Sequence, residues 1–444
     1  MRPLRLRAEW ALPVDAPPIQ HAAVLIGADG RIAAVGPDSD VPAPAGTELE
    51  DLGAAILFPG FVNTHTHLEL TGFEEHAPGL LRPPGGLAMT AEPEHLLFRE
   101  WILNIRAIKA QRHPEEFLQA ARRGVLDCWS AGITTIADTG DSGSVIQALA
   151  ELGGSGICYQ EVFGPDPAQS SESLAGLEAA VGRLLPFATG RVRLGVSPHA
   201  PYTVSGPLYA AVAAWAHARG FPMAVHVAES REESDFVTHR RGPFAEAWAK
   251  RGIPLLDDES HLPSYRPTVL PSPVEWLDSH GVLGPTTLCI HAIQLSPGDI
   301  ALLARRDAPV AHCPLSNARH RHGAAPISAL RAAGIRVGLG TDSVASVGRL
   351  DCFAEAKAAR ELGGLSAEAA VALATLDGAR ALGLGQETGS LTPGKWGDVV
   401  AVAAESREIA GNRSPAEVVL GAGLTGVCLT VLGGRVVYRR EAPA

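Results

Sequence analysis

Between residues 56 and 339, short apolar segments of strand character alternate with stretches rich in alanine and leucine. Helical composition separates several of them, at residues 207–218, 299–306 and 367–382. Strands that alternate with helices form parallel sheets, because a parallel crossover needs a dozen or more residues. The expected strands are 56–62, 133–137, 156–162, 192–196, 223–227, 287–290, 309–311 and 337–339. Eight such strands predict an α/β fold, a closed (β/α)8 barrel of the TIM type.

The alternative is an open, doubly wound sheet. That fold usually carries a glycine-rich phosphate loop after an early strand, and we find no such loop in this sequence.

Both ends of the chain have a different sequence pattern, in which two apolar runs flank a turn. Residues 21–36 surround Asp29-Gly30, and residues 426–438 surround Gly433-Gly434. Such dipeptides between apolar runs are typical of β-hairpins. We therefore expect a small β-sandwich domain built from residues 1–57 and 386–444, with the barrel over residues 58–385.

Two stretches inside the barrel region have the composition of loops. Residues 74–94 are rich in glycine and proline, and residues 231–275 are long and polar with several prolines. Long loops in a compact domain are often lids over a site. A variable surface insertion is the alternative for each.

Charge and cysteine usage limit the class of partner. The 444 residues carry 37 basic and 48 acidic side chains, a net charge of −11, which argues against nucleic acid. The six cysteines form no paired motif, no apolar run is long enough to span a membrane, and the N-terminus lacks the apolar core of a signal peptide. We expect a cytoplasmic protein with a small-molecule substrate and no membrane contact. A homodimer is the candidate assembly.

Several expected strands end in side chains that bind metals. His65 and His67 stand two apart at the end of the first strand, so both can point to the same face. His226, His291 and Asp342 end the fifth, sixth and eighth strands. Active sites of such barrels lie at this end of the strands. Imidazole and carboxylate ligands suit Zn²⁺ or Fe²⁺.

Each of these residues also has an ordinary structural interpretation as a hydrogen-bonded core histidine or a capping aspartate. A second pair, His320-Arg321-His322, follows Ser316 and Asn317 in a polar stretch instead of a strand. We interpret this second pair as a coincidence or as part of a substrate loop.

Taken together, these segments resemble the amidohydrolase superfamily, in the branch of nucleoside-type deaminases and chlorohydrolases. The resemblance covers nearly the whole chain. It is carried by PGFVNTHTH (59–67), SPHAPYT (197–203), HVAES (226–230), SPVEWLDSHGVL (272–283), CPLSN (313–317), GTDS (340–343) and GSLTPGKWGDVV (389–400).

The resemblance implies a role for individual residues. The metal ligands would be His65, His67, His226 and Asp342. Glu229 would carry protons between water and the substrate ring, His291 would orient the water or the developing oxyanion, and Asp342 would pass a proton to departing ammonia. The substrate-binding residues would be Glu69, His199, Asn317 and Ser343.

The resemblance also implies one metal ion per chain. Dinuclear members of the superfamily carry a carboxylated lysine at the end of the fourth strand. Here that position reads Gly195 to His199, and none of the four lysines is near it. One divalent ion, Zn²⁺ or Fe²⁺, is therefore expected.

Substrate identity depends on weaker features. The stretch HTHLEL, with Glu69 beside the histidine pair, resembles deaminases of 6-aminodeoxyfutalosine, an adenine nucleoside with a benzoate group in menaquinone biosynthesis. Alternatives are a deaminase of S-adenosylhomocysteine or methylthioadenosine, a guanine-type deaminase, a chlorohydrolase, and a barrel without catalytic activity. The candidates to bind a substrate carboxylate are Arg82, Arg99, Arg231, Arg319 and Arg321.

Overall fold

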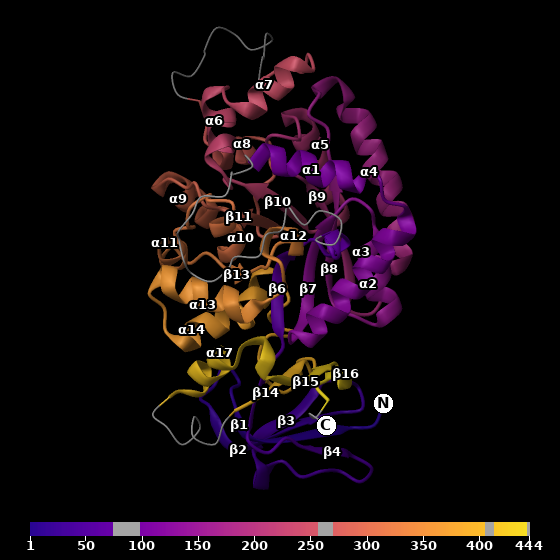
Figure 1. Cartoon of the computed structure of the whole chain (residues 1–444), viewed down its shortest axis with the longest axis vertical. Helices are drawn as coiled ribbons and strands as arrows, with labels where there is room; N and C mark the ends of the chain where they lie inside the picture. Colours follow the sequence, from indigo (N-terminus) through magenta and orange to yellow (C-terminus); the bar gives the residue numbers. More distant parts are fainter. Residues whose placement is uncertain (74–97, 256–269, 405–412, 442–444) are drawn as a thin grey trace.

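The computed structural model describes residues 1–73, 98–255, 270–404 and 413–441. Its two sheets form separate layers along the long axis of the molecule. The barrel lies above, and a sheet from both chain ends lies below it (Figure 1).

Eight parallel strands form the barrel, as the sequence predicts. They follow one another in chain order: β6 (Phe61–Thr66), β7 (Ile133–Gly140), β8 (Gly156–Val162), β9 (Val192–Pro198), β10 (Met223–Val227), β11 (Thr287–His291), β12 (Val310–His312) and β13 (Val337–Leu339). A parallel bridge between Thr66 and Asp342 brings the last strand to the first. The ring is thereby nearly closed, and the carboxyl ends of all eight strands face one side.

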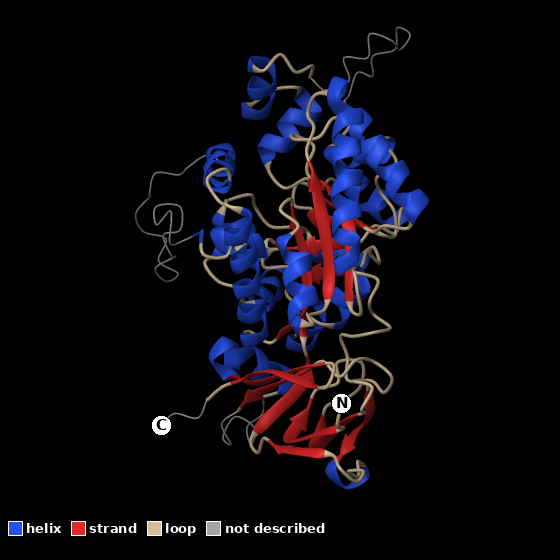
Figure 2. Ribbon diagram, turned by 90° about the vertical axis from the view of Figure 1, so that its right-hand side faces the viewer, coloured by secondary structure: helices blue, strands red, loops and turns tan. Residues whose placement is uncertain are grey.

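Helices surround the barrel, as Figure 2 shows. The main ones are α2 (Pro114–Ser130), α3 (Ser144–Leu152), α4 (Ser170–Leu184), α5 (Gly206–Arg219), α9 (Pro297–Arg305), α11 (Ile327–Ala332) and α13 (Cys352–Gly363). Their apolar faces and the outward side chains of the strands form one large buried cluster. A smaller cluster fills the barrel interior, where Val62, Ile157 and Ile290 meet Ala379 of α15 (Leu376–Ala381).

The first expected strand, 56–62, is two strands. β5 (Ala55–Pro59) belongs to the terminal sheet, and β6 begins the barrel after Gly60. At Gly60 the chain passes from the terminal sheet to the barrel in close contact with Thr134. A Cβ atom on Gly60 would lie 2.2 Å from the Thr134 hydroxyl oxygen. Only glycine fits this approach, so a continuous apolar run conceals a change of sheet.

The terminal sheet joins the two ends of the chain. Its strands are β1 (Leu4–Ala11), β2 (Ile19–Ile26), β3 (Ile32–Pro37), β4 (Glu48–Asp51), β5, β14 (Val399–Ala403), β15 (Val427–Leu432) and β16 (Arg435–Arg439). The pairs β2–β3 and β15–β16 are the two expected hairpins. Antiparallel pairing of β5 with β14 joins the N-terminal and C-terminal halves, above a core of its own.

Two sequence expectations about local structure are wrong. Most of the described part of 231–275 is helical, in α6 (Arg231–His239), α7 (Pro243–Lys250) and α8 (Pro273–Ser279). Ser230 and Ser272 cap α6 and α8 by accepting hydrogen bonds from backbone N–H groups, so polar residues here begin helices. The expected helix at 367–382 is interrupted between α14 (Ala367–Leu373) and α15, where Thr375 is not helical.

Residues 74–94 and Arg82 lie outside the described residues. Within the described part, no helix is long and apolar enough to cross a membrane. The remaining helices are α1 (Phe98–Lys109), α10 (Pro314–Arg319), α12 (Val344–Val347) and α17 (Pro415–Gly426).

Candidate active site

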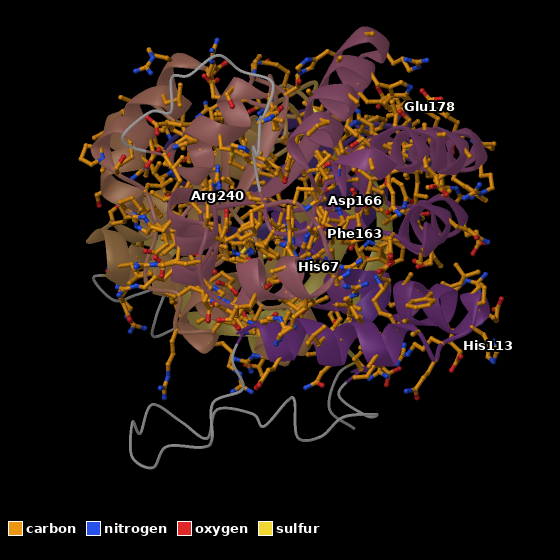
Figure 3. The ribbon with its side chains drawn as sticks, turned by 90° about the horizontal axis from the view of Figure 1, so that it is seen from above. His67, His113, Phe163, Asp166, Glu178 and Arg240 are labelled. Carbon is orange, nitrogen blue, oxygen red and sulfur yellow. The ribbon has the colours of Figure 1, made fainter. Side chains whose placement is uncertain are left out.

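Three histidines from two distant parts of the chain meet at the carboxyl end of the barrel. His65 and His67 come from the end of β6 and His226 from β10, and one ring nitrogen of each lies within 4.8 Å of the others. Asp342, just after β13, places Oδ1 3.7 Å from His65 Nε2 and 3.5 Å from His67 Nε2. Figure 3 looks down on this end, with His67 near its centre.

Hydrogen bonds fix which nitrogen of each ring is available. His67 Nδ1 lies 2.7 Å from the carbonyl of Thr139, and His226 Nδ1 lies 3.2 Å from the carbonyl of His199. A carbonyl only accepts, so each Nδ1 carries a proton and each Nε2 offers a lone pair. Both ring nitrogens of His65 are buried without a partner in the described structure.

Burial lowers the pKa of His65, His67 and His226. The three rings are therefore neutral at neutral pH, which is the protonation state that a metal ion requires. Two oriented Nε2 atoms, an unpartnered buried imidazole and an adjacent carboxylate fit a single divalent cation.

The backbone conformation of Asp342 is unusual, and two hydrogen bonds fix its carboxylate. Its backbone has a φ of 55°, its Oδ1 accepts a 2.7 Å hydrogen bond from Ser343 N, and its Oδ2 accepts a 2.5 Å hydrogen bond from the Ser316 hydroxyl. The Ser343 hydroxyl is fully buried and accepts from Ser346 N as the cap of α12. This oxygen therefore contributes to the cap of α12, and the expected contact of Ser343 with the substrate stays a prediction.

Glu229 follows β10 and lies among three side chains that can donate hydrogen bonds. Its Oε1 is 3.5 Å from His291 Nε2 and 3.4 Å from His322 Nδ1, and its Oε2 is 3.5 Å from the Tyr202 hydroxyl. Burial raises the pKa of Glu229, but His291 and His322 outweigh burial and hold that pKa well below its ordinary value. The carboxylate is therefore ionised and able to accept a proton.

A second glutamate fixes the turn that carries Glu229. The backbone N–H groups of Ala228 and Glu229 donate to the two carboxylate oxygens of Glu233, at 2.7 and 2.9 Å. Ala228 has a φ of 52°, an unfavourable conformation that these bonds stabilise. Glu233 is fully buried at the start of α6, so the helix positions the proton carrier.

Asn317 orients His291 instead of reaching outward. Its Oδ1 lies 3.0 Å from His291 Nδ1, and its Nδ2 lies 3.3 Å from His312 Nδ1. Asn317 is 1% exposed. Asn317 thereby directs His291 Nε2 toward Glu229, and its expected contact with the substrate stays a prediction.

His322 belongs to the site, although the sequence analysis assigns its pair to coincidence or to a substrate loop. Its side chain is buried, contacts the Phe98 ring at a centroid distance of 4.5 Å, and faces Glu229. No periodic pattern marks it, because it lies in the turn after α10 and reaches the site through the tertiary fold. Its partner His320 packs against Trp101 on α1.

The carboxylate of Glu69, which the sequence analysis expects to bind the substrate, has several partners within the protein. Lys109 and the Ser142 hydroxyl contact its carboxylate, and Ser142 N donates to Oε2 at 3.1 Å. Despite burial, Lys109 lowers the pKa of Glu69 to about 2. Glu69 is 1% exposed and acts as the buried anchor for α1. The scarcity of lysine was the only sequence signal for Lys109.

His199 lies at the end of β9, where the sequence places it. Its ring is 4.7 Å from that of His226, and its Nδ1 is 2.8 Å from the Thr203 hydroxyl. Burial lowers the pKa of His199 to about 3, so the ring is neutral. Glu161, at the end of β8, forms a second cluster with His199 and His226, and the sequence analysis missed it.

The arginine candidates lie at different depths. Arg231 and Arg321 are exposed, and Arg99 and Arg319 are half-buried. No described contact selects one of them for a substrate carboxylate.

Comparison with known proteins is consistent with this geometry. Residues 56–251 and 265–437 match the model of the amidohydrolase family. The chain belongs to the amidohydrolase family. A 5-methylthioadenosine/S-adenosylhomocysteine deaminase from Symbiobacterium thermophilum is 30% identical over 433 residues, covering 94% of this chain and 89% of that protein.

An aminodeoxyfutalosine deaminase from Deinococcus radiodurans is 31% identical over 338 residues, 75% of each chain. Among solved structures, a zinc-bound adenosine deaminase from Xanthomonas campestris is 25% identical, with a TM-score of 0.79 over 98% of this chain and 92% of that one. Each of these relatives matches at least three quarters of this chain.

Proposed function

We propose that this amidohydrolase is a metal-dependent hydrolytic deaminase of a 6-aminopurine nucleoside, with 6-aminodeoxyfutalosine as the first candidate substrate. The observation that carries the proposal is the position of Glu229 between His291 and His322, beside the cluster of three neutral imidazoles. Family membership and the deaminase names of the relatives support the reaction class.

His65, His67, His226 and Asp342 would hold one divalent ion, either Zn²⁺ or Fe²⁺. Such an ion supplies Lewis acidity and a bound water whose pKa is about 7. The zinc in the Xanthomonas relative supports this assignment.

The side chains of this protein would move the protons. Ionised Glu229 accepts a proton from the water and delivers it to a ring nitrogen of the substrate. The water oxygen adds to the ring carbon that bears the amino group. Asp342 would take the remaining proton of the added hydroxyl and pass it to the departing amine, the carbon–nitrogen bond breaks, and the products are ammonia and the oxygenated ring.

His291 would stabilise the oxygen added to the ring. With Nδ1–H donating to Asn317 Oδ1, a proton on Nε2 as well makes this ring a donor toward the new oxygen. Removal of Asn317 would therefore release the ring that performs this role.

The substrate proposal is supported by the aminodeoxyfutalosine deaminase relative and the HTHLEL stretch. The runner-up is a deaminase of S-adenosylhomocysteine or methylthioadenosine, which the Symbiobacterium relative favours. The benzoate group of 6-aminodeoxyfutalosine is negatively charged and would be repelled by an acidic protein. An arginine near the site would offset this repulsion, because its guanidinium binds a carboxylate through two parallel hydrogen bonds.

The test compares kcat/KM for ammonia release from 6-aminodeoxyfutalosine, S-adenosylhomocysteine, adenosine and guanine in one buffer. We expect the nucleosides to exceed guanine, because a substrate without the sugar leaves protein polar groups unpaired. A tenfold preference for guanine or a chlorinated triazine contradicts the nucleoside assignment.

A further inference from the structure

A glutamate on the third barrel strand is buried, and one of its carboxyl oxygens has no hydrogen-bond partner in the described structure. Glu161 is 7% exposed, and no group in the described structure donates a hydrogen bond to its Oε1. Burial raises the pKa of Glu161 well above its ordinary value, and Lys109 compensates for only part of this effect. A buried polar group without a hydrogen-bond partner costs free energy, so a ligand that donates a hydrogen bond to this oxygen would be stabilised there.

A second metal ion is a poor occupant. Glu161 clusters with His199 and His226, but His226 also belongs to the cluster with His65 and His67. His226 Nδ1 faces the carbonyl of His199, which leaves one nitrogen with one lone pair. An ion held by the first cluster therefore removes the third ligand from the second, and only Glu161 and His199 remain.

An exposed aromatic ring completes the surroundings of Glu161. Phe163 follows two residues later, just beyond the end of β8. Phe163 is 41% exposed, and its ring centroid lies 4.9 Å from that of His199. Viewed from above, Phe163 lies near the centre of the barrel end, close to His67 in that view (Figure 3).

We propose that Glu161, His199 and Phe163 form the subsite for the sugar of the substrate, a proposal that rests on the nucleoside function above. A carboxyl oxygen accepts hydrogen bonds in either protonation state, and acidic side chains bind ribose hydroxyls in nucleotide-binding proteins. The vicinal hydroxyls donate to Glu161, His199 Nε2 offers a third polar contact, and the C–H face of the sugar packs on Phe163. Glu161 would thereby bind the sugar hydroxyls, whereas the carboxylate of Glu69 is paired with Lys109.

The experiment compares adenosine with 2′,3′-dideoxyadenosine for the zinc-loaded wild type, Glu161→Met and the control Glu178→Met. Glu178 is an exposed glutamate on α4. For wild type we expect kcat/KM for adenosine to exceed that for the dideoxy analogue by about tenfold or more per hydroxyl, mainly through KM. Glu161→Met removes most of this preference, and Glu178→Met retains it.

Thermal unfolding separates binding from a structural role. Because Glu161 is buried and its Oε1 has no hydrogen-bond partner in the described structure, Glu161→Met is expected to unfold at the same temperature as wild type or higher. A lower unfolding temperature with equal losses on both substrates overturns the proposal, as does a wild type indifferent to the hydroxyls. A second equivalent of zinc that disappears in Glu161→Met also overturns it, in favour of a metal site.

Binding of inosine and 2′,3′-dideoxyinosine provides a readout without turnover. If no aminopurine nucleoside releases ammonia, the proposed function fails. Tighter binding of inosine than of the dideoxy compound, lost in Glu161→Met, would still support the sugar subsite. Equal binding of the two by wild type contradicts the subsite even where deamination occurs.

Discussion

Glu229 and Glu233 are buried carboxylates on the same turn, yet their partners differ. Glu233 accepts from two backbone N–H groups, whereas Glu229 faces two imidazoles and the Tyr202 hydroxyl. Chemical consequences of a substitution are therefore expected at Glu229.

Glu229→Gln is expected to keep the fold and the metal content and to lower kcat by about 10²–10⁴-fold, because the amide cannot accept the proton of the water. Steady-state ammonia release and elemental analysis measure the two effects. Glu246→Gln, an exposed change on α7, is the control. A Glu229→Gln variant with nearly wild-type kcat would exclude Glu229 from proton transfer.

His322→Leu is expected to move the acidic limb of the kcat/KM profile to higher pH. Although burial raises the pKa of Glu229, His291 and His322 lower it. With His322 removed, that pKa rises, so the base is lost at a higher pH. His320→Leu, in the same turn, is the comparison, and an unchanged limb in His322→Leu would separate His322 from Glu229.

At the scale of elements, ion pairs of Lys109 with Glu69 and Asp141 connect α1 to the barrel. Lys109 at the end of α1 contacts buried Glu69, and burial of Glu69 is compensated because Lys109 lowers its pKa to about 2. Removing one partner of a buried pair typically costs about 3–5 kcal/mol. The pair is partly open to solvent at Lys109, so a smaller loss is expected here.

Lys109→Gln should lower the free energy of unfolding by about 2 kcal/mol at pH 7. In wild type, the contribution of Glu69 is fully present above its unfolded pKa of about 4.5 and is lost as pH falls toward 2. The difference between variant and wild type should therefore shrink below pH 4.5. Urea unfolding at pH 7 and at pH 4 measures it, with exposed Lys250→Gln as control. A difference that grows on acidification would contradict this account.

For the whole molecule, a metal ion at this site would join distant parts of the chain. The expected ligands come from β6, β10 and the turn after β13, so an ion would tie the two ends of the barrel sequence together.

Zinc-loaded, desalted protein should contain about one equivalent of metal, because His226 offers a single free nitrogen. Excess ligand at about 100 times its Kd stabilises a protein by about 2.7 kcal/mol, so removal of the metal should lower the unfolding temperature. Elemental analysis and thermal unfolding with and without chelator test this. Two tightly held equivalents would contradict a mononuclear site.

Local pattern determined much of this fold. The strand segments, the two terminal hairpins and the positions of His65, His226, His291 and Asp342 at strand ends follow from periodicity and spacing, which depend on neighbouring residues. A parallel barrel then brings the carboxyl ends of its strands together, independently of the conformation of the loops. The sequence therefore predicted where a site would lie and which residue types would face it.

Only the tertiary structure decided the partners of these side chains. Gly60 changes sheets because Thr134 lies against it, Glu69 is closed off because α1 delivers Lys109, and His322 reaches Glu229 from a turn without periodicity. Glu161 Oε1 lacks a hydrogen-bond partner in the described structure for the same reason. Each outcome depends on contacts between residues far apart in the chain, and burial then sets charge and availability. A sequence pattern specifies the local element, whereas the free energy of each polar group depends on what the whole fold packs around it.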